Sequence, residues 1–209
     1  LIDISSEAHL ARLDEVRKDI AHLADPRRSL GPKDLTALIE RTPAIAYLAY
    51  AIHGDELSST DAALRVAYEL AAGETPDVQN FLENLVVLID PMENPDGRER
   101  ILAMNAAYLG SVPNPDSDAL SHSGLWPWGR GNHYLFDLNR DWFALVHPES
   151  RGRADILRIW RPQLVVDSHE MGFDDTYLFS PSRDPFNPNL PTSTPIRWER
   201  FASDQARAF

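Results

Sequence analysis

The chain has 209 residues, of which 43% are hydrophobic and 25% are charged, a composition that is ordinary for a soluble globular protein with one sizeable core. No apolar run reaches the ~18 residues that a membrane span requires. The formal net charge of −12, without any basic stretch, argues against nucleic acid and anionic membrane surfaces as partners. Because there are no cysteines, disulfides and thiolate metal sites are excluded, and any metal must be held by His, Asp or Glu.

The N-terminal part of the chain contains two helical patterns followed by a strand. Apolar residues at helical spacing predict a helix over 5–24, which Pro26 ends. A proline opens a second predicted helix over 32–41. Residues 44–52 are apolar almost throughout, which is typical of a strand that is covered on both faces.

The rest of the chain continues this alternation, apart from one long loop. We predict helices over 58–72, 76–83, 98–110, 147–162 and 195–209, and strands over 85–90, 163–169 and 176–180. Residues 111–134 are rich in Pro, Gly, Ser, Asn and Trp and show no periodicity, and so long a loop in a compact domain is usually functional or disordered. The alternation predicts an α/β fold, with a mixed, largely parallel twisted sheet flanked by helices.

Residues able to do chemistry follow the ends of the predicted strands, where open α/β sheets form their sites. His53 and Glu56 lie three residues apart in a strand-to-helix turn, and Gly54 lets the backbone bend there. A capping or surface role would account for this pair equally well. With His169 at the end of the third strand, however, the two histidines and the glutamate form the three-ligand open set that is typical of catalytic zinc.

Further carboxylates lie beside these residues in the sequence. Asp55 and Asp167 are candidate hydrogen-bond partners for a ligand imidazole, and solvated or capping roles are the equal alternative. Glu170 adjoins His169, but adjacent strand residues point to opposite faces of a sheet. We therefore expect Glu170 to support the structure rather than to act as a base.

Two more segments supply amides and cations. "NPDGRER", residues 94–100, is predicted to be a tight turn whose Pro and Gly fix the backbone. "FDLNRDW", residues 136–142, places Asn139 and Arg140 between aromatic residues. The arginine could cover apolar surface, or it could form a fork for a carboxylate that the Asn139 amide reinforces.

Four motifs together resemble the zinc metallocarboxypeptidase family, the carboxypeptidase A-like peptidases. They are "HGDE" (53–56), "NPDG" (94–97), "DLNRDW" (137–142) and "DSHE" (167–170), in the family's order. The resemblance covers roughly residues 40–180. "GRGNHYLFDLNRDW" and "SHEMG" are most similar to a large bacterial branch whose members are usually multidomain and exported. The resemblance implies a zinc carboxypeptidase-like (phosphorylase/hydrolase-like) fold and a periplasmic or extracellular location.

The resemblance also implies roles for individual residues. One zinc ion would be bound by His53, Glu56 and His169. Asn139 and Arg140 would bind the terminal carboxylate of a peptide or protein substrate. Arg130, in preference to Arg98 or Arg100, would polarise the scissile carbonyl.

The family's general base, a glutamate, and a tyrosine on a mobile loop come well after the third zinc ligand. The family domain runs to ~300 residues. We therefore expect residues 1–209 to be one truncated catalytic domain, incomplete at its C-terminal end, that lacks the base and is monomeric.

Two other functions stay open at this point. N-acyl amino acid amidohydrolases of the related fold share motifs like "HGDE" and "DLNR", although "NPDG" favours the peptidase. Because the base is missing, a third hypothesis also stays open, in which the chain is a non-catalytic module that binds zinc or a carboxylate.

Overall fold

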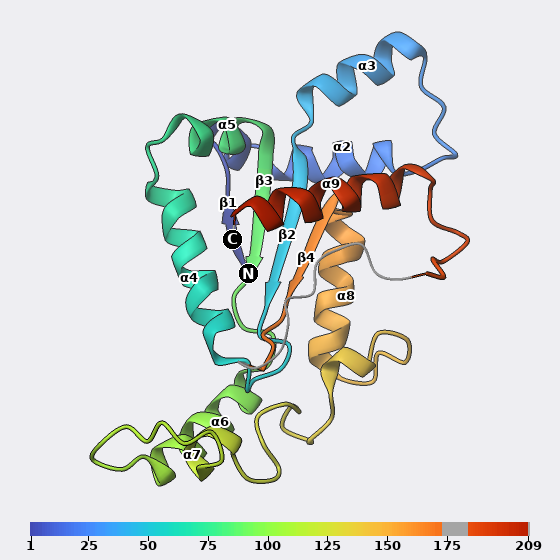
Figure 1. Ribbon diagram of the computed structural model, residues 1–209. Coiled ribbons are helices and arrows are strands. Elements are labelled where there is room, and N and C mark those ends of the chain that lie inside the picture. The colour runs from blue at the N-terminus through green and yellow to red at the C-terminus, as the bar shows by residue number, and fades with distance from the viewer. Residues whose placement is uncertain (173–183, 209) are drawn as a thin grey trace. The chain divides into compact units, whose positions relative to one another are not determined.

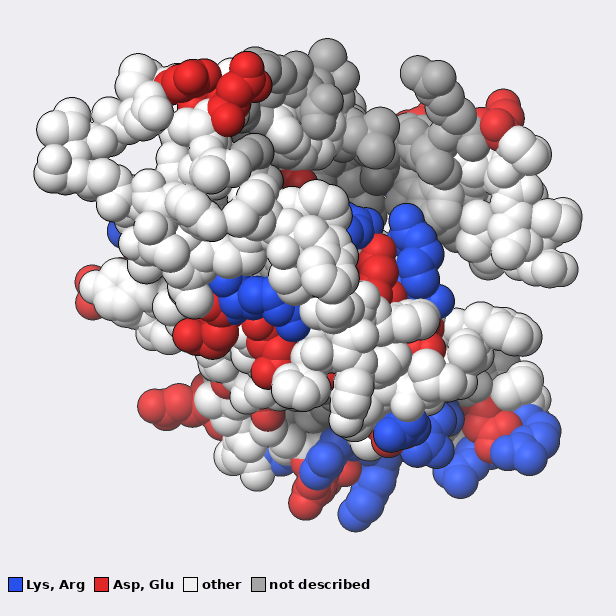
Figure 2. Space-filling view, turned by 90° about the horizontal axis from the view of Figure 1, so that it is seen from below, with Lys and Arg blue, Asp and Glu red and all other residues white. Residues whose placement is uncertain are grey.

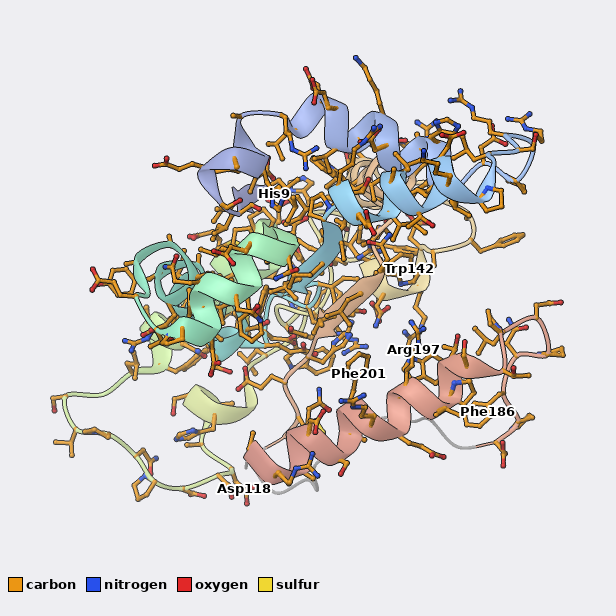
Figure 3. The ribbon with its side chains drawn as sticks, turned by 90° about the horizontal axis from the view of Figure 1, so that it is seen from above. His9, Asp118, Trp142, Phe186, Arg197 and Phe201 are labelled. Atoms are coloured by element: carbon orange, nitrogen blue, oxygen red, sulfur yellow. The ribbon has the colours of Figure 1, made fainter. Side chains whose placement is uncertain are left out.

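The chain divides into two units, Leu1–Glu170 and Met171–Phe209, and each is described by itself. The computed structural model describes residues 1–172 and 184–208. The second unit contains helix α9, Ser193–Ala208, which confirms the predicted C-terminal helix with a start two residues earlier. The ring centroid of Phe186 lies 6.2 Å from that of Trp198 on this helix. Figure 3 labels Phe186, and Arg197 and Phe201 on the helix. The strand predicted over 176–180 lies outside the described residues.

A four-stranded sheet forms the described core of the first unit, in the order β1-β3-β2-β4 (Figure 1). The strands are β1 Ile2–Ile4, β2 Ala44–Tyr50, β3 Leu85–Asp90 and β4 Leu164–Ser168. Strand β2 runs parallel to both β3 and β4, whereas β1 is antiparallel to β3. The predicted mixed, largely parallel sheet is confirmed. Sequence analysis missed β1, because three residues are too few to show a period.

Helices cover both faces of this sheet (Figure 1). Helices α2, Leu13–Leu23, and α8, Pro148–Trp160, cover one face, and α4, Leu57–Ala72, covers the other with α5, Pro76–Asn84. Alternate strand residues point to opposite faces, which is why β2 and β3 are apolar throughout. The first face presents Ile45, Tyr47, Ala49, Val86 and Leu88, and the second presents Leu48, Tyr50, Val87 and Ile89.

The helix predicted over 5–24 is wrong in one respect, because the structure breaks it into α1, Glu7–Leu10, and α2. Arg12 leaves the helical conformation, with φ −130°, and its carbonyl accepts the N–H of Val16. Its guanidinium donates to the carbonyl of Arg41, at the end of α3, Pro32–Arg41. The break thus lets α2 turn onto the sheet. Helix α2 ends at Leu23, before Pro26.

The turn predicted over 94–100 is also wrong, because these residues open helix α6, Pro95–Tyr108. The Asn94 side chain accepts the backbone N–H of Gly97 at 2.9 Å, and Pro95 occupies the first helical position. Two short elements also went unpredicted, α7, Leu120–Ser123, and the 3₁₀ turn η1, Leu138–Arg140. No helix among the described residues is long and apolar enough to span a bilayer.

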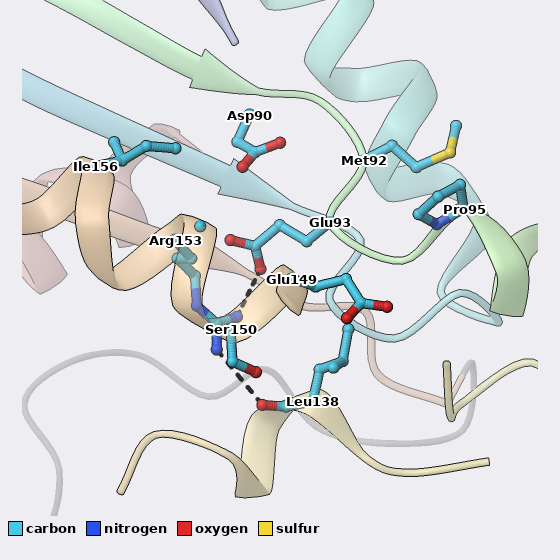
Figure 4. Close-up of a pocket in the computed structure, with 10 residues that line it drawn as sticks. Asp90, Met92, Glu93, Pro95, Leu138, Glu149, Ser150, Arg153 and Ile156 are labelled. Carbon is cyan, nitrogen blue, oxygen red and sulfur yellow. Dashed lines mark hydrogen bonds and ion pairs between the residues drawn. The ribbon is translucent and has the colours of Figure 1, made fainter. Parts of the chain in front are cut away.

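A buried ion pair connects the end of β3 to α8 (Figure 4). Arg153 donates to Glu93 at 2.9 Å, and both side chains are almost fully buried. Burial raises the pKa of Glu93 to about 7, although the Arg153 guanidinium opposes the shift. The Tyr47 hydroxyl donates to Glu93 and Asp90 at 3.1 and 3.2 Å. A pocket of about 340 Å³ is lined by Asp90, Glu93, Arg153 and Leu138, among others. Arg153 also donates to the carbonyl of Leu138, so this polar contact connects η1 to α8.

A substitution of Leu88 tests how much the packing of the sheet contributes to the free energy of unfolding. Leu88 is 0% exposed, and Leu88→Ala should lower the free energy of unfolding by about 2–5 kcal/mol, because it leaves a cavity between packed layers. Leu64→Ala is the matched control, since Leu64 is 56% exposed on α4 and its loss should cost no more than about 0.5 kcal/mol. Urea unfolding measures both. Equal losses would contradict the packing described here.

Candidate functional site

The end of β2 aims His53 at the carboxyl edge of the sheet. Ala51 adopts a left-handed conformation, with φ +56°, which its backbone bonds hold in place. Its N–H donates to the Ser59 hydroxyl, and its carbonyl accepts the N–H of Asn94, both at 3.0 Å. His53 follows and is only 2% exposed. These two bonds of Ala51 fix the backbone two residues before His53.

The structure brings together the three predicted zinc ligands. Nδ1 of His53 lies 2.7 Å from Oε1 of Glu56, and Nδ1 of His169 lies 3.1 Å from Oε2 of the same carboxylate. One donor atom from each residue falls within 4.8 Å of the other two. Two donors come from the turn after β2 and one from the end of β4, although Glu56 and His169 are 113 residues apart.

Each imidazole has a carboxylate at its other nitrogen. Nε2 of His53 lies 3.0 Å from Asp137, and Nε2 of His169 lies 3.3 Å from Asp167. Such partners fix the ring orientation and leave Nδ1 free to bind a metal. Asp167 was a candidate for this role, but the carboxylate at His53 is Asp137 rather than Asp55. Only the position of Asp137 inside the "DLNRDW" motif could have indicated it.

The turn η1 places Asn139 beside this cluster. The Asp137 carboxylate accepts the backbone N–H of Asn139 at 2.9 Å and so caps the turn. The indole N–H of Trp142 donates to the Asn139 side-chain oxygen at 2.9 Å, which leaves the amide nitrogen 3.3 Å from Nε2 of His169. Arg140 is exposed, and its guanidinium donates to the Asn139 carbonyl. Sequence analysis missed the orienting role of Trp142.

Of the three arginines considered for the carbonyl, Arg130 lies next to the cluster. Its guanidinium pairs with Asp137 at 3.0 Å, and its NH1 lies 3.4 Å from Nδ1 of His53. Arg98 is directed elsewhere, since it donates to the Leu57 carbonyl at 2.7 Å. Arg100 is bonded to backbone carbonyls of residues 128–132. The catalytic role of Arg130 stays a prediction.

The comparisons with known proteins fit this geometry. The sequence model of a family described as "Zinc carboxypeptidase" matches residues 27–162, about two thirds of the chain. The chain belongs to the zinc carboxypeptidase family. No curated protein matches it. The matched region contains His53 and Glu56 but ends before β4, and the structure places His169 beside them.

The donor set is suited to the zinc of this family. Zinc–ligand bonds of about 2.0–2.1 Å put tetrahedral donors about 3.3 Å apart. The two histidine–glutamate separations, 2.7 and 3.1 Å, lie near this value, and all three donors lie within 4.8 Å of one another. Two imidazoles and one carboxylate leave a fourth position open. The surrounding carboxylates of Asp137 and Asp167 offset the charge of a cation. Figure 2 views the molecule from this end, where basic side chains lie against acidic ones.

Glu170 has the structural role expected for it. Its carboxylate accepts the N–H and the hydroxyl of Ser58, at 2.9 and 2.7 Å, and thus caps the first turn of α4. Its own N–H donates to Glu56 at 3.0 Å. The carboxylate of Glu170 is therefore engaged at α4, while its backbone orients Glu56.

The cluster is strongly polarised in the metal-free protein. Burial alone would raise the pKa of Glu56, but hydrogen bonds to His169 and His53 outweigh it and lower the pKa to about 2. Hydrogen bonds to Asp167 and Glu56 raise the pKa of His169 to about 10, against the effect of burial. His169 is thus protonated and Glu56 ionised over the neutral range, and a metal must displace the imidazole proton.

Zinc affinity should therefore depend on pH. Because His169 is protonated below about pH 10, zinc binding releases its proton, and the affinity should fall about tenfold for each pH unit from 9 to 7. Asp167→Asn removes the largest cause of the raised pKa and should flatten this slope, while weakening binding by roughly 10–100-fold. Chelator competition at each pH measures the affinity.

Asp155→Asn is the matched control, because Asp155 is an exposed aspartate paired with Arg158 on α8. It should keep the wild-type slope. An affinity that does not change between pH 7 and 9 in the wild-type protein would show that His169 is already neutral.

Proposed function

We propose that the chain binds one zinc ion through His53, Glu56 and His169, and that this site serves hydrolysis of the C-terminal peptide bond of peptide substrates. The observation that carries the proposal is the convergence of these three donors within 4.8 Å at the carboxyl edge of the sheet. The family match supports hydrolase chemistry of this general type. The proposal that the substrate is the C-terminal end of a peptide rests on the side chains that surround the cluster.

Asn139 and Arg140 supply those groups. The Asn139 amide is oriented by Trp142, and its nitrogen faces the cluster, where it can donate to a carboxylate. Arg140 follows directly and is exposed. Its guanidinium donates through Nη1 to the Asn139 carbonyl, and its other donors can form a fork with the same carboxylate. A substrate held this way would place its last peptide bond over the three ligands.

Arg130 is proposed to stabilise the negative charge that develops on the carbonyl oxygen. Its guanidinium lies beside His53 and is held by Asp137, so it is oriented before a substrate arrives. Zinc, when bound, would supply Lewis-acid polarisation of the carbonyl and of a water molecule. We assign no proton transfer to Glu170, because its carboxylate caps α4.

The ligand assignment can be tested with metal content. His53→Ala and His169→Ala should each weaken zinc binding by roughly a hundredfold or more, since loss of a ligand exceeds the 10–100-fold cost of losing its partner. His122→Ala is the control, because that histidine is exposed on α7 and contacts the Asn114 carbonyl. Zinc is measured in the dialysed proteins. Stoichiometric zinc in both ligand variants would defeat the assignment.

Carboxylate recognition can be tested by binding, which requires no base. The zinc-loaded protein should bind a blocked dipeptide with a free C-terminus roughly 10–100-fold more tightly than its C-terminal amide, as expected for charged hydrogen bonds. Arg140→Ala should remove this preference, and Arg158→Ala, on exposed α8 surface, should retain it. Calorimetry measures both ligands. Preference for a long-chain N-acyl amino acid over the dipeptide would favour deacylation instead.

A further inference from the structure

Residues 128–132, which carry Arg130, lie directly against the first turn of α6. A Cβ atom built on Gly97 would lie 2.2 Å from the carbonyl oxygen of Gly129, and one built on Gly129 would lie 2.7 Å from that of Gly97. No side chain fits between the two backbones at such distances. The segment has no regular secondary structure, and Trp128 adopts a left-handed conformation with φ +50°.

Side chains of α6 take the place of regular backbone pairing. The Arg100 guanidinium donates to the carbonyls of Trp128 and Gly131, both at 3.1 Å, and to that of Asn132 at 2.8 Å. The Asn94 amide donates to the carbonyl of Arg130 itself at 3.0 Å. The backbone on both sides of Arg130 is therefore held from one helix.

We propose that Arg100 is a positioning residue that acts through Arg130. By fixing the carbonyls before and after Arg130, it determines where that guanidinium lies relative to His53, and this inference rests on the function proposed above. The planar fork of arginine can reach three carbonyls from one side chain, whereas a lysine ammonium is a single point of donation. Arg100→Lys should therefore keep the charge but lose part of the clamp.

Arg98 shows that the role is specific to position 100. It lies in the same turn of α6, but its guanidinium donates to the Leu57 carbonyl and pairs with Asp61 on α4. The far end of the clamped segment has its own anchor, since the Asn132 side chain is 1% exposed and accepts the N–H groups of Tyr134 and Phe136. Arg100 thus joins this anchor to α6.

The first test uses hydrogen exchange and does not depend on activity. The amides of Trp128 and Asn132 are hydrogen-bonded, to the carbonyls of Leu125 and Phe136, and so report on the order of the segment. In Arg100→Lys they should exchange at least about tenfold faster, with unchanged exchange in the core strands. Arg12→Lys, which alters an arginine–carbonyl bond at the opposite edge of the sheet, should leave them unchanged.

The second test measures ligand binding to the zinc-loaded proteins. Arg100→Lys should weaken a dipeptide phosphonate, whose tetrahedral anion resembles the oxyanion, by about tenfold or more. Binding of a blocked amino acid with a free carboxylate should change less than about twofold, since Asn139 and Arg140 are untouched. In an Arg130→Ala background, Arg100→Lys should cause no further loss.

The outcomes separate the two proposals. Unchanged exchange over residues 128–132 in Arg100→Lys, or an equal loss of phosphonate affinity with and without Arg130, would overturn the positioning role. If the zinc-loaded wild-type protein binds neither ligand, the proposed function is wrong. The exchange result then still decides whether Arg100 holds the segment. Should Arg100→Lys fail to fold, Arg100→Gln, which keeps donors without the charge, replaces it in both tests.

Discussion

Three glycines in contact hold the candidate site together. A Cβ atom on Gly54 would lie 2.1 Å from the backbone nitrogen of Arg98, and one on Gly97 would lie 2.2 Å from the Gly129 oxygen. Each glycine comes from a different segment, and two of them adjoin a predicted site residue, His53 or Arg130. Because no side chain separates these backbones, one stack of peptide groups fixes the backbone positions next to His53 and Arg130.

Charge balance explains why carboxylates surround the cluster of His53, Glu56 and His169. Asp137 contacts His53, Arg130 and the backbone of Asn139, so a single side chain connects a predicted zinc ligand, the proposed oxyanion donor and the turn η1. The Asp137 carboxylate thus offsets part of the charge of a bound dication and also holds the side chains around it in place. Hydrogen bonds within the cluster lower the pKa of Glu56 and raise that of His169, so the carboxylate is ionised and the imidazole is protonated at neutral pH.

The sequence predicted the parts of this site that depend on local pattern. Apolar runs indicated β2, β3 and β4, and the carboxyl ends of parallel strands must share one edge, so the approach of His53 to His169 could be expected. The roles of Asp137 and Arg100 could not, because each side chain reaches a residue far away in the sequence. The role of Trp142 depends on the turn η1, which the sequence did not predict. Likewise, no local signal shows that Arg12 interrupts the first helix, since its partner lies on another element.

The position of His169, the third predicted zinc ligand, depends on strand register. Strand β4 pairs with β2 so that Asp167 lies opposite Ala49 and Ser168 opposite Tyr50, and His169 follows directly. Asp167 and His169 are two residues apart, so both point toward the cluster and contact each other, whereas Glu170 turns toward α4. A slip of one residue would exchange these faces and direct Glu170 rather than His169 at Glu56. The site therefore requires both the glycine stack on one side of β2 and the correct pairing of β4 on the other.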